Sequence, residues 1–230
     1  INLPGPHILA LGSSTSFPVT VSDANGNPVT TNFVSGPAGS AFSGGLFSWT
    51  ASPTNFVNTT NWVVFSADDG QGATNSVVTN TASIVVPFDF DGDGLGDDWE
   101  IGYYATLTNA PGGDTDEDGV PNGDEYVAGT LPTSSNSFFR VQTMAFATTN
   151  RLITVPTVGG RRYQAWYADQ AYSNQTGWQA FGNTNDGYGT WLETNPAGGT
   201  RSFVDDQTTN STFGPPAGGQ RTYRVTVEGP

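Results

Sequence analysis

The chain has 230 residues, no cysteine and a formal net charge of −14, with seven arginines and no lysine against 21 acidic residues. Without cysteine it can form neither disulfides nor thiolate metal sites, and a cysteine nucleophile is excluded. Because no basic stretch could replace phosphate counterions, nucleic acid is not an expected partner. The sequence contains no run of about 20 apolar residues, so no membrane span is predicted.

Residues 1–87 read as an all-β domain. Short apolar or alternating runs at 16–21, 46–50, 62–66 and 82–86 are separated by turns rich in Asp, Asn, Gly and Pro, a spacing that predicts a β-sandwich. Four stretches of this segment are VSDANGNPVT, GLFSWTASP, VVFSADDGQGA and SIVV. They resemble the immunoglobulin-like and cadherin-like domains of bacterial surface proteins, which implies the same sandwich fold. The cadherin resemblance offers Asp23, Asp68 and Asp69 as calcium ligands, whereas turn chemistry makes them acceptors for their own backbone, the interpretation we favour.

Twelve of the acidic residues and none of the arginines lie between 89 and 125. This block contains two 12-residue segments that begin 25 residues apart and fit a calcium loop, with oxygen ligands at positions 1, 3, 5, 7, 9 and 12 and glycine at position 6. Position 7 contributes its carbonyl oxygen. The predicted ligands are Asp89, Asp91, Asp93, Leu95, Asp97 and Glu100 in the first loop, and Asp114, Asp116, Asp118, Val120, Asn122 and Glu125 in the second.

Each loop is expected to continue into a short helix, from 98 to about 107 and from 124 to about 128, with position 9 as N-cap and position 12 as its capping-box partner. No entering helix precedes either loop, which argues against a helix–loop–helix hand. The phrases DGDGLGDDWEIGYY and DEDGVPNGDEYVAGT resemble thrombospondin type 3-like repeats, which are similar to the duplicated loops of dockerins. That resemblance implies a compact module over 88–137 with two bound Ca²⁺. Leu131 stands where such repeats often place a further acid.

Residues 138–230 again read as strands, which predicts a second β-sandwich and loosely resembles the C-terminal domains of modular secreted bacterial proteins. The expected strands are 138–142, 152–158, 163–168, 177–181, 201–204 and 222–228. Aromatic residues gather in this segment and could either fill the core, the interpretation we favour, or stack on sugars. They are Trp166, Tyr167, Tyr172, Trp178, Tyr188 and Trp191, of which Trp166, Trp178 and Trp191 are the candidate sugar-binding residues.

No catalytic constellation is recognisable. His7 is the single histidine and has no nucleophile beside it in the sequence; there is no phosphate loop and no Gly-x-Ser-x-Gly elbow. Glu193, Asp205 and Asp206 are expected at turns. The chain is therefore not expected to be an enzyme.

The fold expected is mainly β, with two β-sandwiches (1–87 and 138–230) joined by a small calcium module (88–137) that carries two short helices. The expected function is that of an exported, extracellular structural or adhesive protein, in which Ca²⁺ makes the link between the sandwiches rigid. Assembly into a surface fibre or layer could use residues 1–11 as a donor strand, or this segment could be the first strand of its own domain. Glycans are further candidate partners. The alternative function is that of a carbohydrate-binding accessory region of a larger secreted enzyme.

Overall fold

The computed structural model describes residues 1–52, 58–72, 76–147, 150–169, 177–182, 189–208, 211–216 and 219–229. The chain divides into two compact units, Ile1–Asn109 and Ala110–Pro230. One predicted calcium loop falls in each unit, so residues 88–137 do not form a compact unit of their own in this division. The fold is mainly β with two short helices, as the sequence predicts. Neither helix in the described part of the chain is long and apolar enough to cross a membrane.

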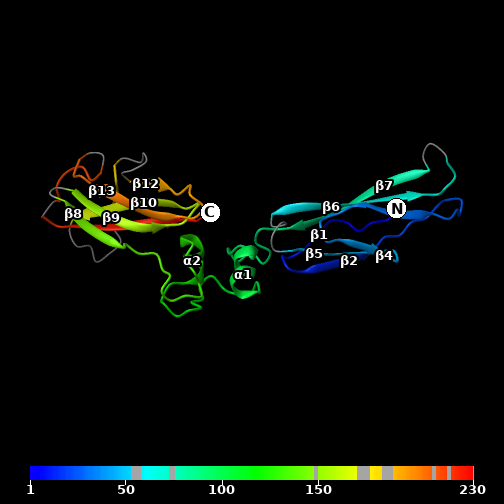
Figure 1. Ribbon diagram of the computed structural model, residues 1–230, viewed down its shortest axis with the longest axis horizontal. Helices are drawn as coiled ribbons and strands as arrows, with labels where there is room; N and C mark the ends of the chain where they lie inside the picture. The colour runs from blue at the N-terminus through cyan, green and yellow to red at the C-terminus, as the bar shows by residue number, and fades with distance from the viewer. Residues whose placement is uncertain are drawn as a thin grey trace. The chain divides into compact units, whose positions relative to one another are not determined.

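Two sheets face each other in the first unit (Figure 1). One has the strand order β1-β7-β6-β3 and the other β2-β5-β4. β5 has the predicted bounds, whereas β2 begins two residues before the expected strand and ends at Pro18. The strands are β1 (His7–Ile8), β2 (Ser14–Pro18), β3 (Thr30–Ser35), β4 (Ala41–Ser43), β5 (Leu46–Thr50), β6 (Thr59–Asp68) and β7 (Val77–Val86).

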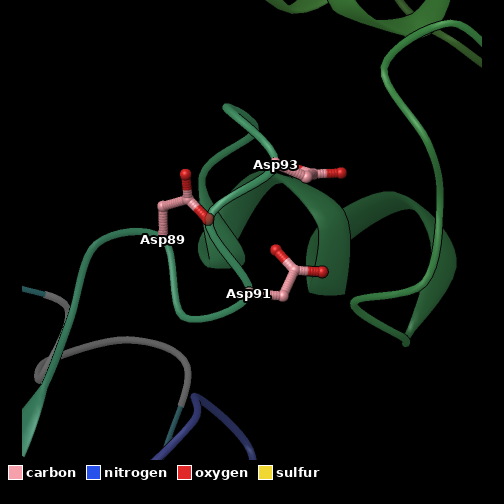
Figure 2. Close-up of side chains that lie close together, drawn as sticks. All are labelled: Asp89, Asp91 and Asp93. Atoms are coloured by element: carbon pink, nitrogen blue, oxygen red, sulfur yellow. The ribbon is translucent and has the colours of Figure 1, made fainter.

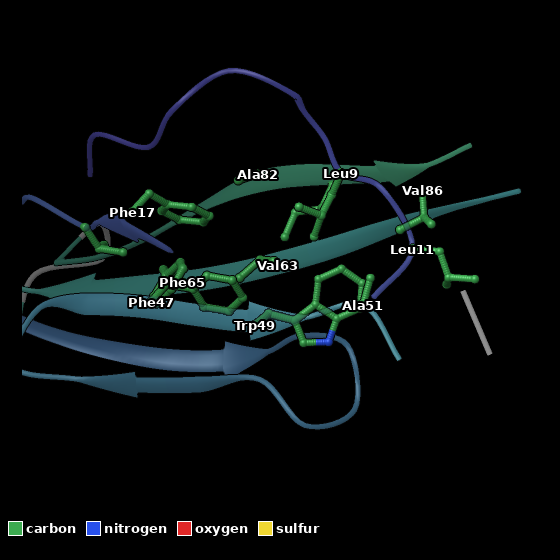
Figure 3. Packing of buried hydrophobic residues seen from close by; sticks show 12 residues of the cluster. Leu9, Leu11, Phe17, Phe47, Trp49, Ala51, Val63, Phe65, Ala82 and Val86 are labelled. Atoms are coloured by element: carbon green, nitrogen blue, oxygen red, sulfur yellow. The ribbon is translucent and has the colours of Figure 1, made fainter. Parts of the chain in front are cut away.

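The core of the first unit lies between these sheets (Figure 3). Alternate residues of β5 and β6 point inward, so that Phe47, Trp49, Val63 and Phe65 are all buried. The Phe47 ring packs edge-on against that of Phe65, with centroids 6.2 Å apart. Burying each of these side chains contributes about 1.5–3 kcal/mol, which makes the alternating pattern the main source of stability here.

The N-terminal segment lies in the sheet of its own unit. β1 pairs with β7 in parallel, His7 opposite Ile84, and the Leu9 amide donates to the Val85 carbonyl at 2.9 Å. Leu9 and Leu11 are both part of the buried core. A donor-strand exchange between copies would therefore require this segment to leave its own sheet.

The second unit also contains two sheets (Figure 1). One has the order β13-β9-β8; in the other, β10 pairs with β14 along one edge and with β11 and β12 along the other. Side chains of both sheets form one core around Ile153, Val155, Tyr163 and Phe203. The strands are β8 (Thr143–Ala147), β9 (Asn150–Thr157), β10 (Arg162–Asp169), β11 (Gln179–Ala180), β12 (Thr190–Leu192), β13 (Gly199–Asp205) and β14 (Arg221–Glu228).

The predicted strand at 138–142 is wrong, because the first strand of this unit begins at Thr143. Phe139 instead packs against the core from an irregular segment. Arg140 lies over the ring of Phe138, with its guanidinium carbon 4.7 Å from the ring centroid. Apolar and aromatic composition alone does not distinguish such a packed segment from a short strand.

Candidate calcium loops

In both acidic loops the carboxylate at position 1 accepts hydrogen bonds from two backbone amides, one of which is that of the glycine at position 6. In the first, Asp89 accepts from the amides of Gly92 and Gly94 at 2.7 and 3.0 Å. In the second, Asp114 accepts from the amides of Asp118 and Gly119 at 3.2 and 2.9 Å. Each loop is thus folded around its first carboxylate.

Positions 5 to 7 are also equivalent. Asp93 accepts from the Leu95 amide at 2.8 Å, and Asp118 accepts from the Val120 amide at 2.8 Å. The glycine at position 6 has a positive φ in both loops, 98° at Gly94 and 93° at Gly119, a conformation that side chains with a Cβ rarely adopt. The backbone conformation at position 6 therefore explains why glycine is expected there.

The carboxylates at positions 1, 3 and 5 converge in each loop. One oxygen from each of Asp89, Asp91 and Asp93 lies within 4.8 Å of the others (Figure 2). The same holds for Asp114, Asp116 and Asp118. Desolvation, followed by repulsion from Asp93, raises the pKa of Asp91 above its usual value. Three like charges at this distance repel one another strongly unless a cation lies between them.

The glutamate at position 12 lies in the helix that follows each loop, near enough for the aspartates of its cluster to affect its pKa. Glu100 and Glu125 are both fully buried. Neither oxygen of Glu100 has a hydrogen-bond partner, and only one oxygen of Glu125 has one, Thr130 Oγ1 at 3.2 Å. Both oxygens of Asp116 and one of Asp118 are likewise buried without a partner. Buried polar atoms are rarely left unpaired in native proteins, so these oxygens point to a missing positive partner.

Burial raises the pKa of both glutamates from 4.5 to about 7. Repulsion from Asp93 and Asp91 adds to the rise at Glu100, and the Asn109 backbone opposes it. At Glu125 the Thr130 hydrogen bond opposes the rise, and Asp116, Asp118 and Asp114 add to it. The residues present therefore fit a hard divalent cation. All predicted ligand atoms are oxygens, which suits Ca²⁺, and no histidine or cysteine sulfur is available to favour zinc.

These pKa values predict an unusual pH dependence for the metal-depleted protein. Because the folded-state pKa of each glutamate exceeds its usual 4.5, the folded state binds protons more tightly at these two groups, so their contribution to stability is fully present below about pH 4.5 and is lost as the pH rises to about 7. Urea unfolding of metal-depleted protein should show this fall between about pH 5 and pH 7.5. A Glu100→Gln/Glu125→Gln double variant should have a flatter profile, and an identical profile would contradict the prediction.

Position 9 has a different role from the predicted helix cap. Asp97 accepts from the Phe90 amide at 2.7 Å and the Leu11 amide at 3.3 Å, whereas Asn122 accepts from the Thr115 amide at 3.3 Å. Both side chains therefore bond position 2 of their own loop. The N-caps are Gly96 and Pro121, and neither makes a side-chain cap bond. The predicted capping boxes are wrong, because the position-9 side chains are held inside the loops.

The helices themselves are close to those predicted. α1 spans Asp97–Tyr104 and α2 spans Asn122–Ala128. α1 ends about three residues earlier than expected, because Ala105 adopts a left-handed conformation with φ 58°. α2 ends in the same way at Gly129, with φ 75°, the usual geometry of a helix C-terminus.

Each loop is attached to the sandwich of its own unit. In the first unit, the Asp97 carboxylate receives the Leu11 amide, and Ile101 packs against the core. In the second, Arg161 donates to the carbonyl oxygens of Tyr126 and Val127 at 3.0 and 3.2 Å. The sequence does not reveal the role of Arg161, since its partners are backbone atoms 34 and 35 residues away.

The candidate sugar-binding tryptophans do not form one group. Trp166 and Trp178 both lie against Arg224, whereas Trp191 packs against the core and lies under Arg201, whose guanidinium carbon is 4.1 Å from the ring. Tyr167 is buried in the core, as the favoured interpretation predicts. Tyr172 and Tyr188 lie outside the described residues.

The remaining polar candidates have structural roles. Asp23 accepts from the amides of Asn25 and Asn27, and Asp68 and Asp69 accept from the amides two residues further on, as turn residues do. Glu193 accepts from Asn195 N at 2.9 Å and from Thr157 Oγ1 at 2.7 Å. His7 stacks on Phe17, with ring centroids 5.3 Å apart.

Asp205 is the centre of a buried network that the sequence does not predict. It accepts from Tyr223 Oη and Thr212 Oγ1, both at 2.6 Å, and pairs with the Arg221 guanidinium at 3.1 Å. Burial alone would raise the pKa of Asp205, but these hydrogen bonds hold it below its usual value. Arg221 also pairs with Asp169 at 2.6 Å. Asp205 thus secures the end of β13 to β14.

Comparison with known proteins does not assign a family. No protein-family model and no curated protein sequence matches the chain. Among solved structures, endo-fucoidan hydrolase MfFcnA9 of glycoside hydrolase family 107 aligns with 36% of this chain and 15% of its own, at 17% identity and a TM-score of 0.27. The corresponding hydrolase MfFcnA4 aligns over 87% and 27%, at 15% identity and a TM-score of 0.28.

The secreted serine protease VesC from Vibrio cholerae aligns over 95% of this chain and 44% of its own, at 12% identity and a TM-score of 0.18. The chain therefore spans less than half the length of each of these three proteins. TM-scores this low do not identify a shared fold.

Proposed function

We propose that this chain is an extracellular, calcium-binding structural or adhesive protein in which each acidic loop holds one Ca²⁺ and stabilises its own β-sandwich. The observation that carries the proposal is the pair of buried glutamates, Glu100 and Glu125, which have unpartnered oxygens and lie within electrostatic reach of the two clusters of three aspartates. A bound Ca²⁺ would supply the positive charge that these carboxylates lack.

The attachment of the loops defines the mechanical role. Asp97 links the first loop to Leu11 in one sandwich, and Arg161 links the helix after the second loop to the other. Filling both loops would fix each helix on its own sandwich, which leaves residues 105–113 as the connecting segment. A shorter free connection restricts the flexing of two domains on an acidic tether.

One observation and one general property of calcium modules support the extracellular part of the proposal. The strand orders β1-β7-β6-β3 and β2-β5-β4 divide seven strands between two sheets, as in immunoglobulin-like surface domains. Extracellular calcium modules bind at about 10⁻⁴ to 10⁻³ M, so such loops would fill outside a cell and stay empty within it.

We further propose that the protein assembles into a surface fibre or layer, which electron microscopy can test directly. Images of the protein with calcium and with a chelator should show ordered assemblies only with calcium. A variant lacking residues 1–10 tests whether strand exchange through the N-terminal segment is the route; unchanged assembly of this variant would eliminate that route.

Calcium binding itself is tested by isothermal titration. The wild-type protein should bind two Ca²⁺, and Glu100→Gln and Glu125→Gln should each remove or severely weaken one site, because each substitution removes the carboxylate at position 12. Glu117→Gln is the matched control, since this exposed residue is in the second loop but at position 4, which supplies no ligand. The proposal fails if the wild-type protein binds no Ca²⁺, or if Glu117→Gln weakens binding as much as Glu125→Gln.

A further inference from the structure

The sheet of the second unit that contains β10 carries a cationic aromatic cluster on its outer face. Tyr163, Ala165 and Tyr167 of β10 point into the core, so Trp166 lies on the opposite face, because side chains alternate along a strand. Arg224 of β14 is directly opposite Trp166 in the register. Its guanidinium carbon lies 5.1 Å from the Trp166 ring and 4.6 Å from the Trp178 ring. We call these three residues the Trp–Arg–Trp cluster.

Arg224 is the unpaired member of this face. Within the described part of the chain it makes no ion pair, because both ion pairs found there belong to Arg221. Its Nε is buried and has no hydrogen-bond partner. A guanidinium that lies against two aromatic rings and makes no ion pair with the described residues can serve as an anion receptor.

The neighbouring polar groups are already paired. Trp166 Nε1 donates to Thr226 Oγ1 at 2.9 Å. The Gln164 amide donates to the carbonyl oxygens of Ala165 and Gly189, both at 2.8 Å, and accepts from Thr190 Oγ1 at 2.7 Å. These bonds hold the side chains around the cluster in place, so ligand binding would lose little free energy to ordering them.

We propose that the Trp–Arg–Trp cluster binds an acidic polysaccharide, one that carries sulfate or carboxylate groups. The planar guanidinium can bind such a group through two parallel hydrogen bonds. The two indole rings are partly exposed and can pack against the apolar faces of the adjoining sugar rings. A ligand with both features uses the arginine and the tryptophans together.

The charge distribution indicates that binding depends on contacts at the Trp–Arg–Trp cluster rather than on a general affinity for polyanions. Residues 138–230, which form the sandwich that holds the cluster, carry seven arginines against six acidic residues, so long-range charge alone neither attracts a polyanion to it strongly nor repels one. Binding therefore requires a specific contact. The site is independent of the proposed calcium loops, since no loop residue belongs to it, and it gives the carbohydrate-binding alternative a defined location.

The test is binding to dextran sulfate and to polygalacturonate, with unmodified dextran and inorganic polyphosphate as comparisons, at physiological salt and saturating calcium. We expect the wild-type protein to bind at least one of the two acidic polysaccharides and neither comparison polymer. Arg224→Gln should weaken binding at least tenfold, as expected for loss of a charge-assisted contact. Arg140→Gln is the matched control, because it makes the same charge change at an arginine that lies over a single ring.

Two measurements separate a lost site from a lost fold. Each variant is checked by thermal melting and by its calcium stoichiometry, neither of which depends on this face. Arg224→Lys keeps the charge but loses the planar fork, so it should also bind more weakly than wild type. The proposal is overturned if wild type binds neither acidic polysaccharide, if it binds polyphosphate equally well, or if Arg224→Gln and Arg140→Gln have equal effects.

Discussion

Removing calcium is expected to lower the melting temperature of both units by about 10 °C or more. An ion present at a hundred times its dissociation constant stabilises the folded state by about 2.7 kcal/mol, and each kcal/mol shifts the midpoint of a domain of this size by about 4 °C or more. Without the ion, Glu100 and Glu125 remain buried beside their aspartates with unpaired oxygens. Calorimetry in excess calcium and in EGTA at about pH 7.5 measures the difference.

The attachment of each loop predicts that the loss is specific to one unit. Glu100→Gln should abolish the calcium-dependent gain in the first unit alone, and Glu125→Gln in the second alone. Hydrogen exchange of the buried amides in β6 and in β10 reports the two units separately. Glu117→Gln should keep both gains. Identical melting in calcium and in EGTA would contradict the proposed role of the loops.

Asp205→Ala is expected to destabilise the second unit by about 3–5 kcal/mol, because it leaves the buried Arg221 with one of its two carboxylate partners and Tyr223 Oη without its acceptor. The neighbouring Asp206 is the matched control. Its carboxylate bonds only nearby turn residues, Thr208 and Ser211, so Asp206→Ala should cost about 1 kcal/mol. Urea unfolding in saturating calcium measures both.

A double variant separates loss of the network from loss of packing. Replacing the buried pair together, as in Asp205→Ala/Arg221→Met, also removes the buried cation that has lost one of its two carboxylate partners. It should therefore be more stable than Asp205→Ala alone. Equal destabilisation by Asp205→Ala and Asp206→Ala would show that the network does not hold β13 to β14.

Local sequence was sufficient for the loops, because their geometry is contained in 12 consecutive residues. The hydrogen bonds of the aspartates at positions 1 and 5 join residues at most five positions apart, and the positive φ at position 6 belongs to a single glycine. Strand positions with clear alternation, such as Leu46–Thr50, were predictable for the same reason. The helix caps were not, because both position-9 side chains bond the amide at position 2 of their own loop, and the Asp97 carboxylate also accepts from the Leu11 amide, 86 residues away.

The sequence by itself therefore determined the mainly β fold, the two short helices and the two oxygen-rich loops, since each depends on periodicity or spacing within a short segment. Only the tertiary structure decided which sandwich each loop joins, that Asp205 meets Arg221 and Tyr223, and that Trp166 and Trp178 both lie against Arg224 while Trp191 packs against the core. These contacts join residues that are far apart in the sequence and that strand pairing brings together. That pairing cannot be predicted from composition and spacing alone.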